Sequence, residues 1–439
     1  MRRVERPPFL SENWDYTELL DDLLKVNKFK EFWEIEGSSY PYWEKWKHLA
    51  HDWGCIPKKL WATVKASRYS KSGIDFHGVA IKPFYISTPL IMQRQLHELD
   101  LNLGGSLHTS ELIPTEEKQR YLVSSLMEEA IASSQLEGAA TTRKLAKQML
   151  ESNRKPRNHS EQMIVNNYAV MQWIVKNKNA VLTPNLITEI HLFITNNTLA
   201  EKKEEGAFRK SDDVQVIDVQ TGHVLHTPPG YQQLEALMNE FRRFANDQKK
   251  ESFFLHPISK AITLHFLIGY IHPFADGNGR TARALFYWYL IKKGYWLIEY
   301  MSVSRVILAS KAQYARAYQY TELDENDLTY FILYNLKCII RALEELKSYI
   351  HRKNKEKQDI LNLLKHTDYN DRQISILQEI LNEKKNVFTV LEVETKFNVS
   401  NQTARNDLNY LVGKGILQPR KSGNKIQFLL TEDGIKKIK

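Results

Sequence analysis

The sequence has few cysteines, no long apolar segment and no internal repeat. Its two cysteines, Cys55 and Cys338, are far apart, so neither a disulfide framework nor a cysteine zinc site is predicted. No run of about 18 apolar residues occurs, as a membrane-spanning helix would require. The first residues, MRRVERPPFLSENWDY, lack the apolar core of a signal peptide. We therefore expect a cytoplasmic protein with no membrane partner.

Positive charge and apolar side chains are both abundant. The formal net charge of +9 favours anionic partners such as nucleotides or nucleic acid, although charge does not determine the fold. A hydrophobic content of 42% in 439 residues is enough for two or three packed cores. One short region is rich in aromatic rings, which we expect to be buried in a core or at a domain contact: Tyr40, Tyr42, Trp43, Trp46, Trp53 and Trp61.

Hydrophobic periodicity and turn residues predict a mainly α fold in four parts. Residues 1–110 are expected to form an aromatic-rich helical region with a turn at Gly104-Gly105. Residues 111–350 form a second helical domain, whose first helix opens after Pro114-Thr115. Residues 351–370 form a basic helix end or linker, and residues 371–439 form a separate small domain.

The segment IHPFADGNGRTAR, residues 271–283, carries the strongest chemical signal. Apolar residues recur at helical intervals before it, and RTARALFYWYLIKKG after it is a second helix, so the segment joins two helices. The first turn of a helix offers unpaired N–H groups to an anion, and Gly277 and Gly279 let the backbone approach a phosphate closely. A phosphate site is predicted.

The charged residues of the segment fit this site. Arg280 and Arg283 are three apart on one helical face, where both side chains can bind a polyphosphate. Asp276 would repel phosphate unless a cation such as Mg²⁺ bridges the two. His272 is the side chain that can accept a proton near neutral pH. Together they predict transfer of a phosphorus-centred group to a hydroxyl.

The segment has three other interpretations: a Walker A loop, an EF-hand and a structural turn. An EF-hand starting at Asp276 is excluded, because it would require glycine at Thr281 and glutamate at Tyr287. A Walker A loop is excluded, because an arginine follows the second glycine and the segment lies between two helices. A structural turn with solvated charges explains any one of these residues. It does not explain why a base, an acid, two glycines and two arginines occur together.

HPFADGNGR, followed by Thr281, Ala282 and Arg283, resembles the signature of the Fic family of protein adenylyltransferases, H-P-F-x-D/E-G-N-G/K-R-x-x-R. Every fixed position is matched, and the resemblance covers roughly residues 115–345. It implies a helical Fic fold that transfers AMP from ATP, with Mg²⁺, to a tyrosine, threonine or serine hydroxyl of a target protein or of the enzyme itself. Pyrophosphate is released.

The resemblance also assigns roles to residues. His272 is the general base and Asp276 the magnesium ligand. The remaining residues of the ATP site are an anion hole, two phosphate-binding arginines and an adenine-pocket tyrosine: Gly277, Asn278, Gly279, Arg280, Arg283 and Tyr314.

A short hairpin is predicted within the helical domain. Valines alternate with polar residues around the turn Thr221-Gly222 in DDVQVIDVQTGHVLH. Segment 211–226 resembles the family's flap, a hairpin that pairs with the backbone of the target protein. The resemblance assigns target docking to Val214, Gln215 and Val216.

The motif SSQLEG, residues 133–138, lies at the end of an apolar helix face. An acid there is most simply an exposed end of the face, but a buried one would need a cationic partner. The motif resembles the family's inhibitory sequence S/T-x-x-x-E-G/N, with Ser133, Glu137 and Gly138 at its fixed positions. The resemblance implies that Glu137 pairs with Arg283 and keeps the resting enzyme weakly active. Some family members also remove AMP, which leaves the reverse reaction open.

Residues 371–439 predict three helices followed by a hairpin at Ser422-Gly423-Asn424, a pattern that resembles a winged helix-turn-helix. Ser400 is the expected N-cap of the third helix. If the domain binds DNA, the first residues of this helix face the major groove and the wing contacts phosphates. The residues concerned are Asn401, Gln402, Thr403 and Arg405 in the helix, and Arg420, Lys421 and Lys425 in the wing.

The sequence therefore predicts two alternative functions. The first is an autoinhibited protein adenylyltransferase, with a homodimer left open. The second is a DNA-binding transcriptional regulator whose Fic domain senses nucleotide or is catalytically silent. A winged helix can equally serve as a protein-contact module, so its presence does not decide between the two.

Overall fold

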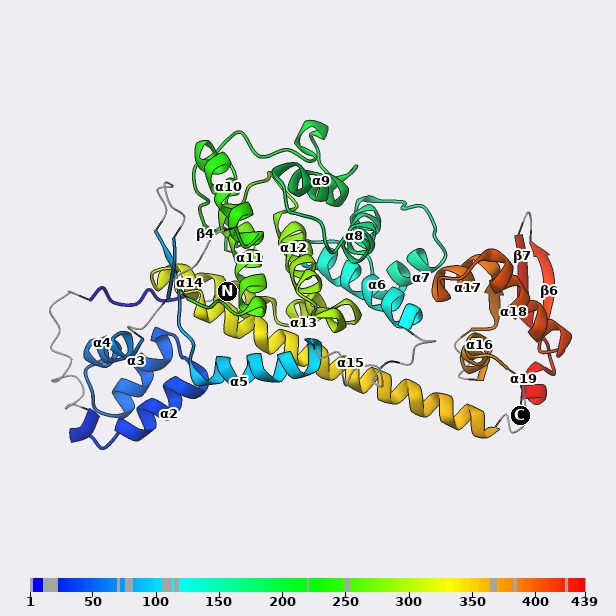
Figure 1. Ribbon diagram of the computed structural model, residues 1–439, viewed down its shortest axis with the longest axis horizontal. Helices are drawn as coiled ribbons and strands as arrows, with labels where there is room; N and C mark the ends of the chain where they lie inside the picture. Colours follow the sequence, from blue (N-terminus) through cyan, green and yellow to red (C-terminus); the bar gives the residue numbers. More distant parts are fainter. Residues whose placement is uncertain are drawn as a thin grey trace. The chain divides into compact units, whose positions relative to one another are not determined.

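The computed structural model describes residues 3–10, 23–68, 72–75, 82–104, 113, 118–218, 221–248, 253–363, 369–381, 385–422 and 425–438. Helices predominate among them, and short strands form three small antiparallel sheets (Figure 1), which confirms the predicted mainly α fold. None of the helices in these ranges is long and apolar enough to cross a membrane. Gly105, Pro114 and Thr115, where a turn and a helix start were expected, lie outside the described residues.

The chain divides into two compact units. The first consists of Met1–Gly104, Trp173–Trp296 and Val306–Ile340, and the second of Gly105–Gln172, Leu297–Arg305 and Arg341–Lys439. Helix α15 (Thr329–Leu363) contributes to both and continues into the predicted basic linker. The bounds of the four parts expected from the sequence stay predictions.

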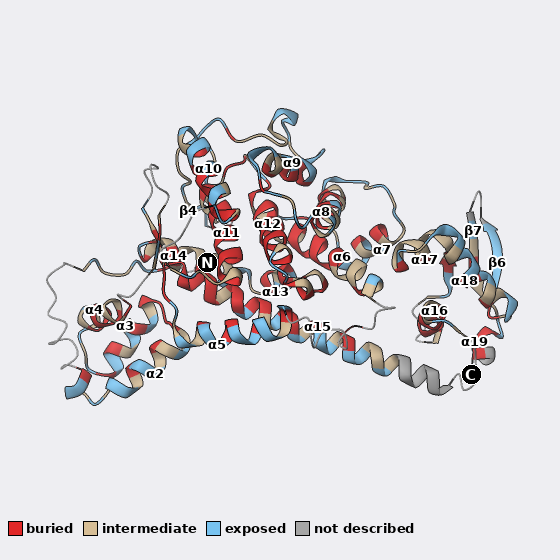
Figure 2. Ribbon diagram, in the orientation of Figure 1, coloured by how far each residue is buried: buried red, intermediate tan, exposed pale blue. Residues whose placement is uncertain are grey.

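Two adjoining helices form the centre of the first unit. In α11 (Pro257–Ile271) and α12 (Asn278–Lys292) nearly every residue is buried (Figure 2). A helix that is apolar on all sides must be enclosed by others. The first unit also contains α9 (Pro184–Thr195), α10 (Leu234–Ala245), α14 (Lys311–Leu323) and the short helices η3 (Lys202–Glu204) and η4 (Tyr231–Gln233).

The amino-terminal region belongs to the same unit. Its elements are α2 (Phe29–Ser39), α3 (Trp43–Asp52), α4 (Pro57–Ser67), β1 (Ser72–Ile74), β2 (Phe84–Ile86), α5 (Leu90–Leu99) and a π-helix, η1 (Asp100–Gly104). All six aromatic residues singled out in the sequence are buried, as predicted. Tyr40 also donates a hydrogen bond to Asp327 at 2.7 Å, which joins this region to the start of α15.

The predicted hairpin is present in the first unit. Strand β3 (Val216–Ile217) pairs with β4 (Val224–His226), with Val216 opposite His226 and an irregular register beyond it. Gly222 has φ of +70° in the turn, a conformation that favours glycine.

The second unit contains α6 (Lys118–Leu136), α7 (Arg143–Glu151) and α8 (His159–Lys176), the last of which ends in the first unit. Their shared core includes Met127, Ile131, Met149 and Ile164. Helix η5 (Trp296–Tyr300) and helix α13 (Val303–Ala309) cross the boundary between the units.

The rest of the second unit has the predicted winged-helix arrangement: α16 (Asp371–Leu381), α17 (Val390–Phe397), α18 (Asn401–Gly413), a three-stranded sheet and α19 (Gly434–Ile438). The sheet order is β5 (Val387–Thr389), β7 (Lys425–Leu430), β6 (Leu417–Ser422). Ser400 caps α18 as expected and accepts a hydrogen bond from the Thr403 N–H at 3.2 Å. The wing turn Gly423-Asn424 lies outside the described residues.

Candidate active site

His272 lies where α11 ends. It is the C-cap of the helix, in the left-handed region with φ of 49°. Its Nδ1 lies 3.1 Å from the carbonyl oxygen of Gly269. A carbonyl oxygen only accepts, so Nδ1 must carry the proton of this hydrogen bond. In the neutral ring, Nε2 is then the nitrogen that accepts a proton, as a general base requires.

Gly277 sits at the amino end of α12 as its N-cap, with φ of +81°. A Cβ at this position would lie 2.9 Å from Cγ2 of Thr195 and 3.1 Å from Nε2 of His191. The site therefore needs glycine for both its conformation and its space. Because α12 starts at Asn278, the first N–H groups of the helix, including that of Gly279, have no partner within the helix and suit an anion.

The side chain of Asn278 fixes the shape of the loop. Its Oδ1 accepts from the N–H of Phe274 at 3.0 Å, and its Nδ2 donates to the carbonyl oxygen of Phe274 at 2.8 Å. Asn278 and Phe274 are both buried. Asn278 thus acts here as a clamp across one turn of the loop, which the sequence analysis did not anticipate.

Asp276 and Arg280 form an ion pair with very different exposures. The Asp276 side chain is 58% exposed, that of Arg280 is 0% exposed, and Oδ2 lies 3.6 Å from Nη2. Arg280 also donates from Nη1 to the carbonyl oxygen of Ile194 at 3.0 Å, which ties α12 to α9. The contact of Arg280 with phosphate stays a prediction.

The exposed carboxylate fits the expected Mg²⁺. Magnesium typically binds one or two carboxylates and completes its shell with waters and phosphates. The described part of the chain contains no group of three His, Cys, Asp or Glu residues placed to hold a metal ion. A single exposed carboxylate such as that of Asp276 suits an ion whose other ligands are waters and phosphates.

Arg283 and Tyr314 both lie near a buried histidine, His265. The hydroxyl of Tyr314 is 2.8 Å from Nε2 of His265. Burial and the charge of Arg283 lower the pKa of His265 to about 3, so this ring stays neutral. The structure thus brings two residues predicted to bind ATP toward the same part of α11. Their nucleotide contacts stay predictions.

His191 supports the loop from α9 and was missed in the sequence. Its ring stacks on Phe274 with centroids 3.7 Å apart, and Nε2 lies 2.8 Å from the carbonyl oxygen of Asp276. Nδ1 accepts from the N–H of Gly206 at 3.1 Å, so Nε2 is the donor. Burial lowers the pKa of His191 to about 4, which keeps this donor–acceptor pattern at neutral pH.

Arg209 was missed as well. Its side chain is 2% exposed and donates from Nε to the carbonyl oxygen of His272 at 2.9 Å. Nη1 donates to Asp212 at 2.8 Å, and Nη2 donates to the carbonyl oxygen of Pro229. One guanidinium therefore connects the backbone of His272 to both ends of the hairpin segment.

The hairpin is also attached to α11 through His226. Its Nδ1 lies 2.7 Å from the Glu322 carboxylate and its Nε2 lies 2.7 Å from the carbonyl oxygen of Tyr270. Both neighbours accept, so both ring nitrogens donate and the ring is an imidazolium. Burial lowers the pKa of His226, but the Glu322 carboxylate and the Tyr270 carbonyl outweigh it, and the net shift is upward.

The edge of the hairpin differs slightly from expectation. Val214 and Gln215 precede β3, and Val216 begins it, so the strand starts later than predicted. Ile217 and Val224, which pair across the hairpin, are each 49% exposed.

The predicted inhibitory motif lies in the second unit. Ser133 is buried in α6, whereas Glu137 is exposed in the turn that follows the helix. Gly138 has φ of +96°, which explains the glycine at this position of the motif. The pairing of Glu137 with Arg283 stays a prediction.

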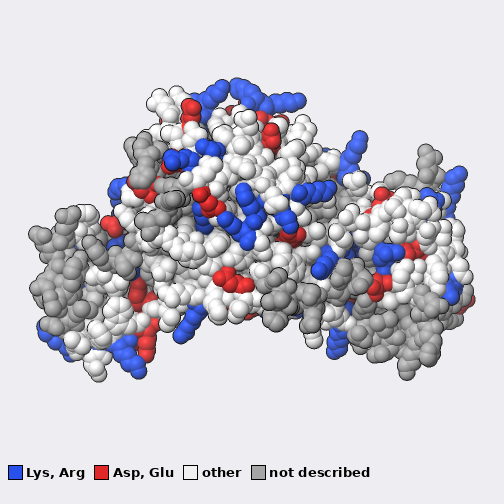
Figure 3. Space-filling model, viewed as in Figure 1, with Lys and Arg blue, Asp and Glu red and all other residues white. Residues whose placement is uncertain are grey.

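The residues predicted to contact DNA lie at the start of α18. Asn401, Gln402 and Arg405 are exposed and Thr403 is half-buried. In the wing, Arg420 and Lys421 are exposed on β6, and the side chain of Lys425 lies outside the described residues. On the molecular face drawn in Figure 3, cationic and anionic side chains are interspersed.

Comparison with known protein families gives two matches. Residues 181–290 match the Fic/DOC family, and residues 372–423 match the DeoR-like helix-turn-helix domain.

The chain is also similar to individual known proteins. The chain is similar to protein adenylyltransferase Fic of Aedes aegypti, with 29% identity over 259 residues, 57% of this chain and 47% of that protein. It is 31% identical to the protein of the same name from Culex quinquefasciatus over 180 residues, 40% of this chain and 32% of that protein. It thus spans less than half of either relative. A crystal structure of a Fic family protein from Desulfovibrio desulfuricans G20 aligns with a TM-score of 0.47 and 17% identity, covering 77% of this chain and 94% of that one.

Proposed function

We propose that this chain, which carries a Fic domain at residues 181–290, is a protein adenylyltransferase that transfers AMP from ATP to a hydroxyl of a target protein. The observation that carries the proposal is the placement of His272. Its Nδ1 donates to the carbonyl oxygen of Gly269, so Nε2 is the nitrogen that can accept a proton beside the amino end of α12. A proton acceptor next to an anion site is what phosphoryl-group chemistry on a hydroxyl needs.

The proposed reaction is an in-line displacement. The hydroxyl oxygen of the target forms a bond to the α-phosphorus of ATP while Nε2 of His272 takes the hydroxyl proton. The bond from the α-phosphorus to the oxygen that bridges to the β-phosphate breaks, and pyrophosphate leaves with the electron pair. The N–H groups at the start of α12 stabilise the charge on the phosphate oxygens.

Asp276 would hold Mg²⁺ together with the ATP phosphates, and the ion would offset their negative charge. Arg283 would bind the γ-phosphate end of the nucleotide. The hairpin would dock the backbone of the target, with its position maintained by Arg209 and His226.

Glu137 would lower this activity in the resting chain. A carboxylate paired with Arg283 competes for the guanidinium that the γ-phosphate needs. An interaction worth a few kcal/mol would reduce the rate by about a hundredfold. The same carboxylate suits a water-activating role in hydrolysis of the AMP ester, which would release AMP and restore the hydroxyl, so removal of AMP is part of the proposal.

Labelled ATP tests the proposal in native cell extract. Glu137→Gly protein should incorporate label from ATP labelled at the α-phosphate and none from ATP labelled at the γ-phosphate. His272→Ala should abolish incorporation, and His51→Ala, which changes an exposed histidine of α3, should not. Equal labelling by the His272→Ala and Glu137→Gly proteins would sink the proposed mechanism.

A second candidate function is DNA binding. The DeoR-like match at residues 372–423 and the exposed start of α18 favour it. Arg405→Ala should weaken binding of a duplex by about tenfold in a gel-shift assay at physiological salt. Binding that disappears at that salt concentration in the unaltered chain would mark a protein-contact module instead.

A further inference from the structure

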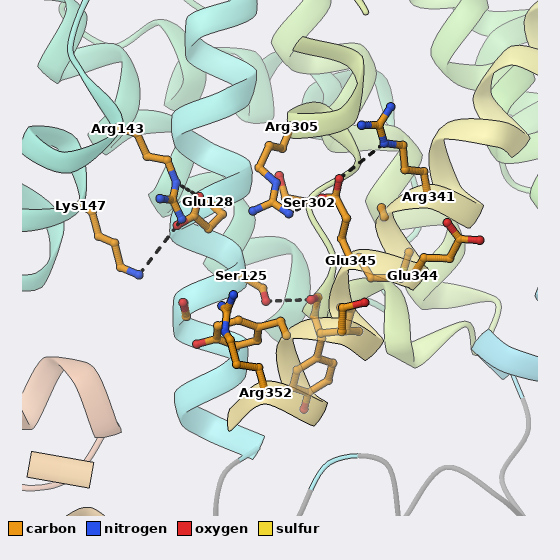
Figure 4. A pocket seen from close by; sticks show the side chains of 17 residues that line it. Ser125, Glu128, Arg143, Lys147, Ser302, Arg305, Arg341, Glu344, Glu345 and Arg352 are labelled. Atoms are coloured by element: carbon orange, nitrogen blue, oxygen red, sulfur yellow. Dashed lines mark hydrogen bonds and ion pairs between the residues drawn. The ribbon is translucent and has the colours of Figure 1, made fainter. Parts of the chain in front are cut away.

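A pocket of about 590 Å³ lies within the second unit, and its lining shares no residue with the candidate active site (Figure 4). Its walls come from α6, α7, the segment 300–305 and the part of α15 at residues 341–352. Ligand sites for small molecules have volumes of about 300–1,000 Å³. The pocket is therefore large enough for a nucleotide-sized ligand.

The charge of the lining is uneven. Five cationic side chains line the pocket: Arg143, Lys147, Arg305, Arg341 and Arg352. The lining also holds three carboxylates, Glu128, Glu344 and Glu345, and Glu356, just outside it, lies 3.9 Å from Arg352, which leaves a surplus of one positive charge. Four of the five cations are arginines, whose flat guanidinium groups bind phosphate oxygens in pairs.

Glu128 and Glu345 form ion pairs with four of the five cations. Glu128 receives two hydrogen bonds from Arg143, from Nε at 2.6 Å and Nη2 at 2.5 Å, and lies 3.8 Å from Lys147. Glu345 lies between Arg305 and Arg341, the latter at 3.6 Å. Each guanidinium has five N–H donors, so these pairs leave donors for a ligand.

Exposure is consistent with ligand access. The side chains of Arg143, Arg341 and Arg352 are 58%, 63% and 65% exposed. The residues behind these arginines are held by hydrogen bonds. Ser125 donates to the carbonyl oxygen of Tyr300 at 2.8 Å, and the buried Glu129 accepts from the N–H of Ser304 at 3.1 Å.

Aromatic rings lie beside the cations. Tyr300 and Tyr349 both line the pocket, and the guanidinium of Arg352 is 5.5 Å from the ring centroid of Tyr349. Tyr349 is held by an edge contact with Tyr121 at 5.6 Å. A ring next to several guanidinium groups suits a ligand that joins a flat base to phosphate.

We propose that this pocket binds a small phosphate ester of the nucleotide class, at a site separate from the ATP site. One wall of the pocket is α6, the helix that leads into the motif Ser133–Gly138. Bound ligand would fix this helix against α15 and the segment 300–305. We therefore expect occupancy to change the rate of AMP transfer, a consequence that rests on the proposed function.

Calorimetric titration tests the site in the full chain. In an Arg283→Ala background, which weakens the ATP site, ADP and inorganic pyrophosphate are titrated separately. Arg341→Glu with Arg352→Glu should lower the affinity for ADP by about tenfold or more. Lys58→Glu with Lys178→Glu, the same charge change at two exposed lysines outside the lining, should leave it unchanged. Arg143→Gln, which keeps a donor for Glu128, is a second variant in case the first fails to fold.

The outcomes separate the possibilities. Tighter binding of ADP than of pyrophosphate supports a nucleotide site, and equal binding shows that phosphate alone is recognised, which overturns the nucleotide class. Equal affinity in the pocket variants and the lysine control overturns the site itself. The affinity for ADP is measured without AMP transfer, so failure of the proposed function, seen as no labelling by Glu137→Gly protein, is distinguished from failure of this site.

Discussion

Glu322→Gln tests the attachment of the hairpin to the candidate active site. The glutamine keeps the shape of the side chain and a hydrogen-bond acceptor, but removes the charge that faces the His226 imidazolium. The side chains of His226 and Glu322 are 9% and 21% exposed, and Nδ1 of His226 lies 2.7 Å from the Glu322 carboxylate. A hydrogen bond to a charged partner contributes about 1.5–3 kcal/mol, and partial exposure reduces this to about 1–2 kcal/mol. Local opening of the hairpin should then become about 5–30 times more frequent.

The effect depends on pH in a defined direction. The pKa of His226 is raised in the folded chain, so its contribution is fully present below the ordinary histidine value of about 6.5 and is lost as pH rises through the raised value. Hydrogen–deuterium exchange of residues 216–226 should therefore differ most between variant and unaltered chain at about pH 6 and least at about pH 9. Glu34→Gln, which alters an exposed ion pair, is the control. The same difference at both pH values, or none at the lower one, would refute the imidazolium assignment.

Two further substitutions test the loop. Gly277→Ala should destabilise the chain by about 1–2 kcal/mol or more, because φ is +81° and the new Cβ meets Thr195. Thermal unfolding measures this, with Gly413→Ala as the control at a glycine that has open space. Asn278→Ala leaves the buried N–H and carbonyl of Phe274 without their partner and should cost about 2–4 kcal/mol. An Asn278→Ala protein with unchanged stability and full labelling activity would contradict the proposed role of the Asn278 side chain.

Much of the candidate site was predictable because its residues are adjacent in the chain. The spacing of His272, Asp276 and Gly277 between two helical patterns placed a base, an acid and a helix start together. The structure has α11 ending at Ile271 and α12 starting at Asn278. The small hairpin and the winged helix were also predictable, because their strands and caps follow local rules of turn and capping residues.

The supporting residues were not predictable. His191 lies 85 positions from Asp276 and Arg209 lies 63 positions from His272, the loop residues whose carbonyl groups they contact, and neither belongs to a local pattern. A single histidine in an apolar helix, or one arginine in a loop, usually has a structural role that only tertiary contacts reveal. The start of β3 was missed for a related reason, since alternation over so few residues does not fix the end of a strand.

Mass spectrometry of a labelled target tests the central claim most directly. Glu137→Gly protein is incubated with ATP and Mg²⁺ in native cell extract, and modified peptides are sequenced. We expect an AMP group on a tyrosine, threonine or serine hydroxyl, absent when His272→Ala is added to the same protein. No AMP adduct on any protein, including the enzyme, or an adduct that persists without His272, would contradict it.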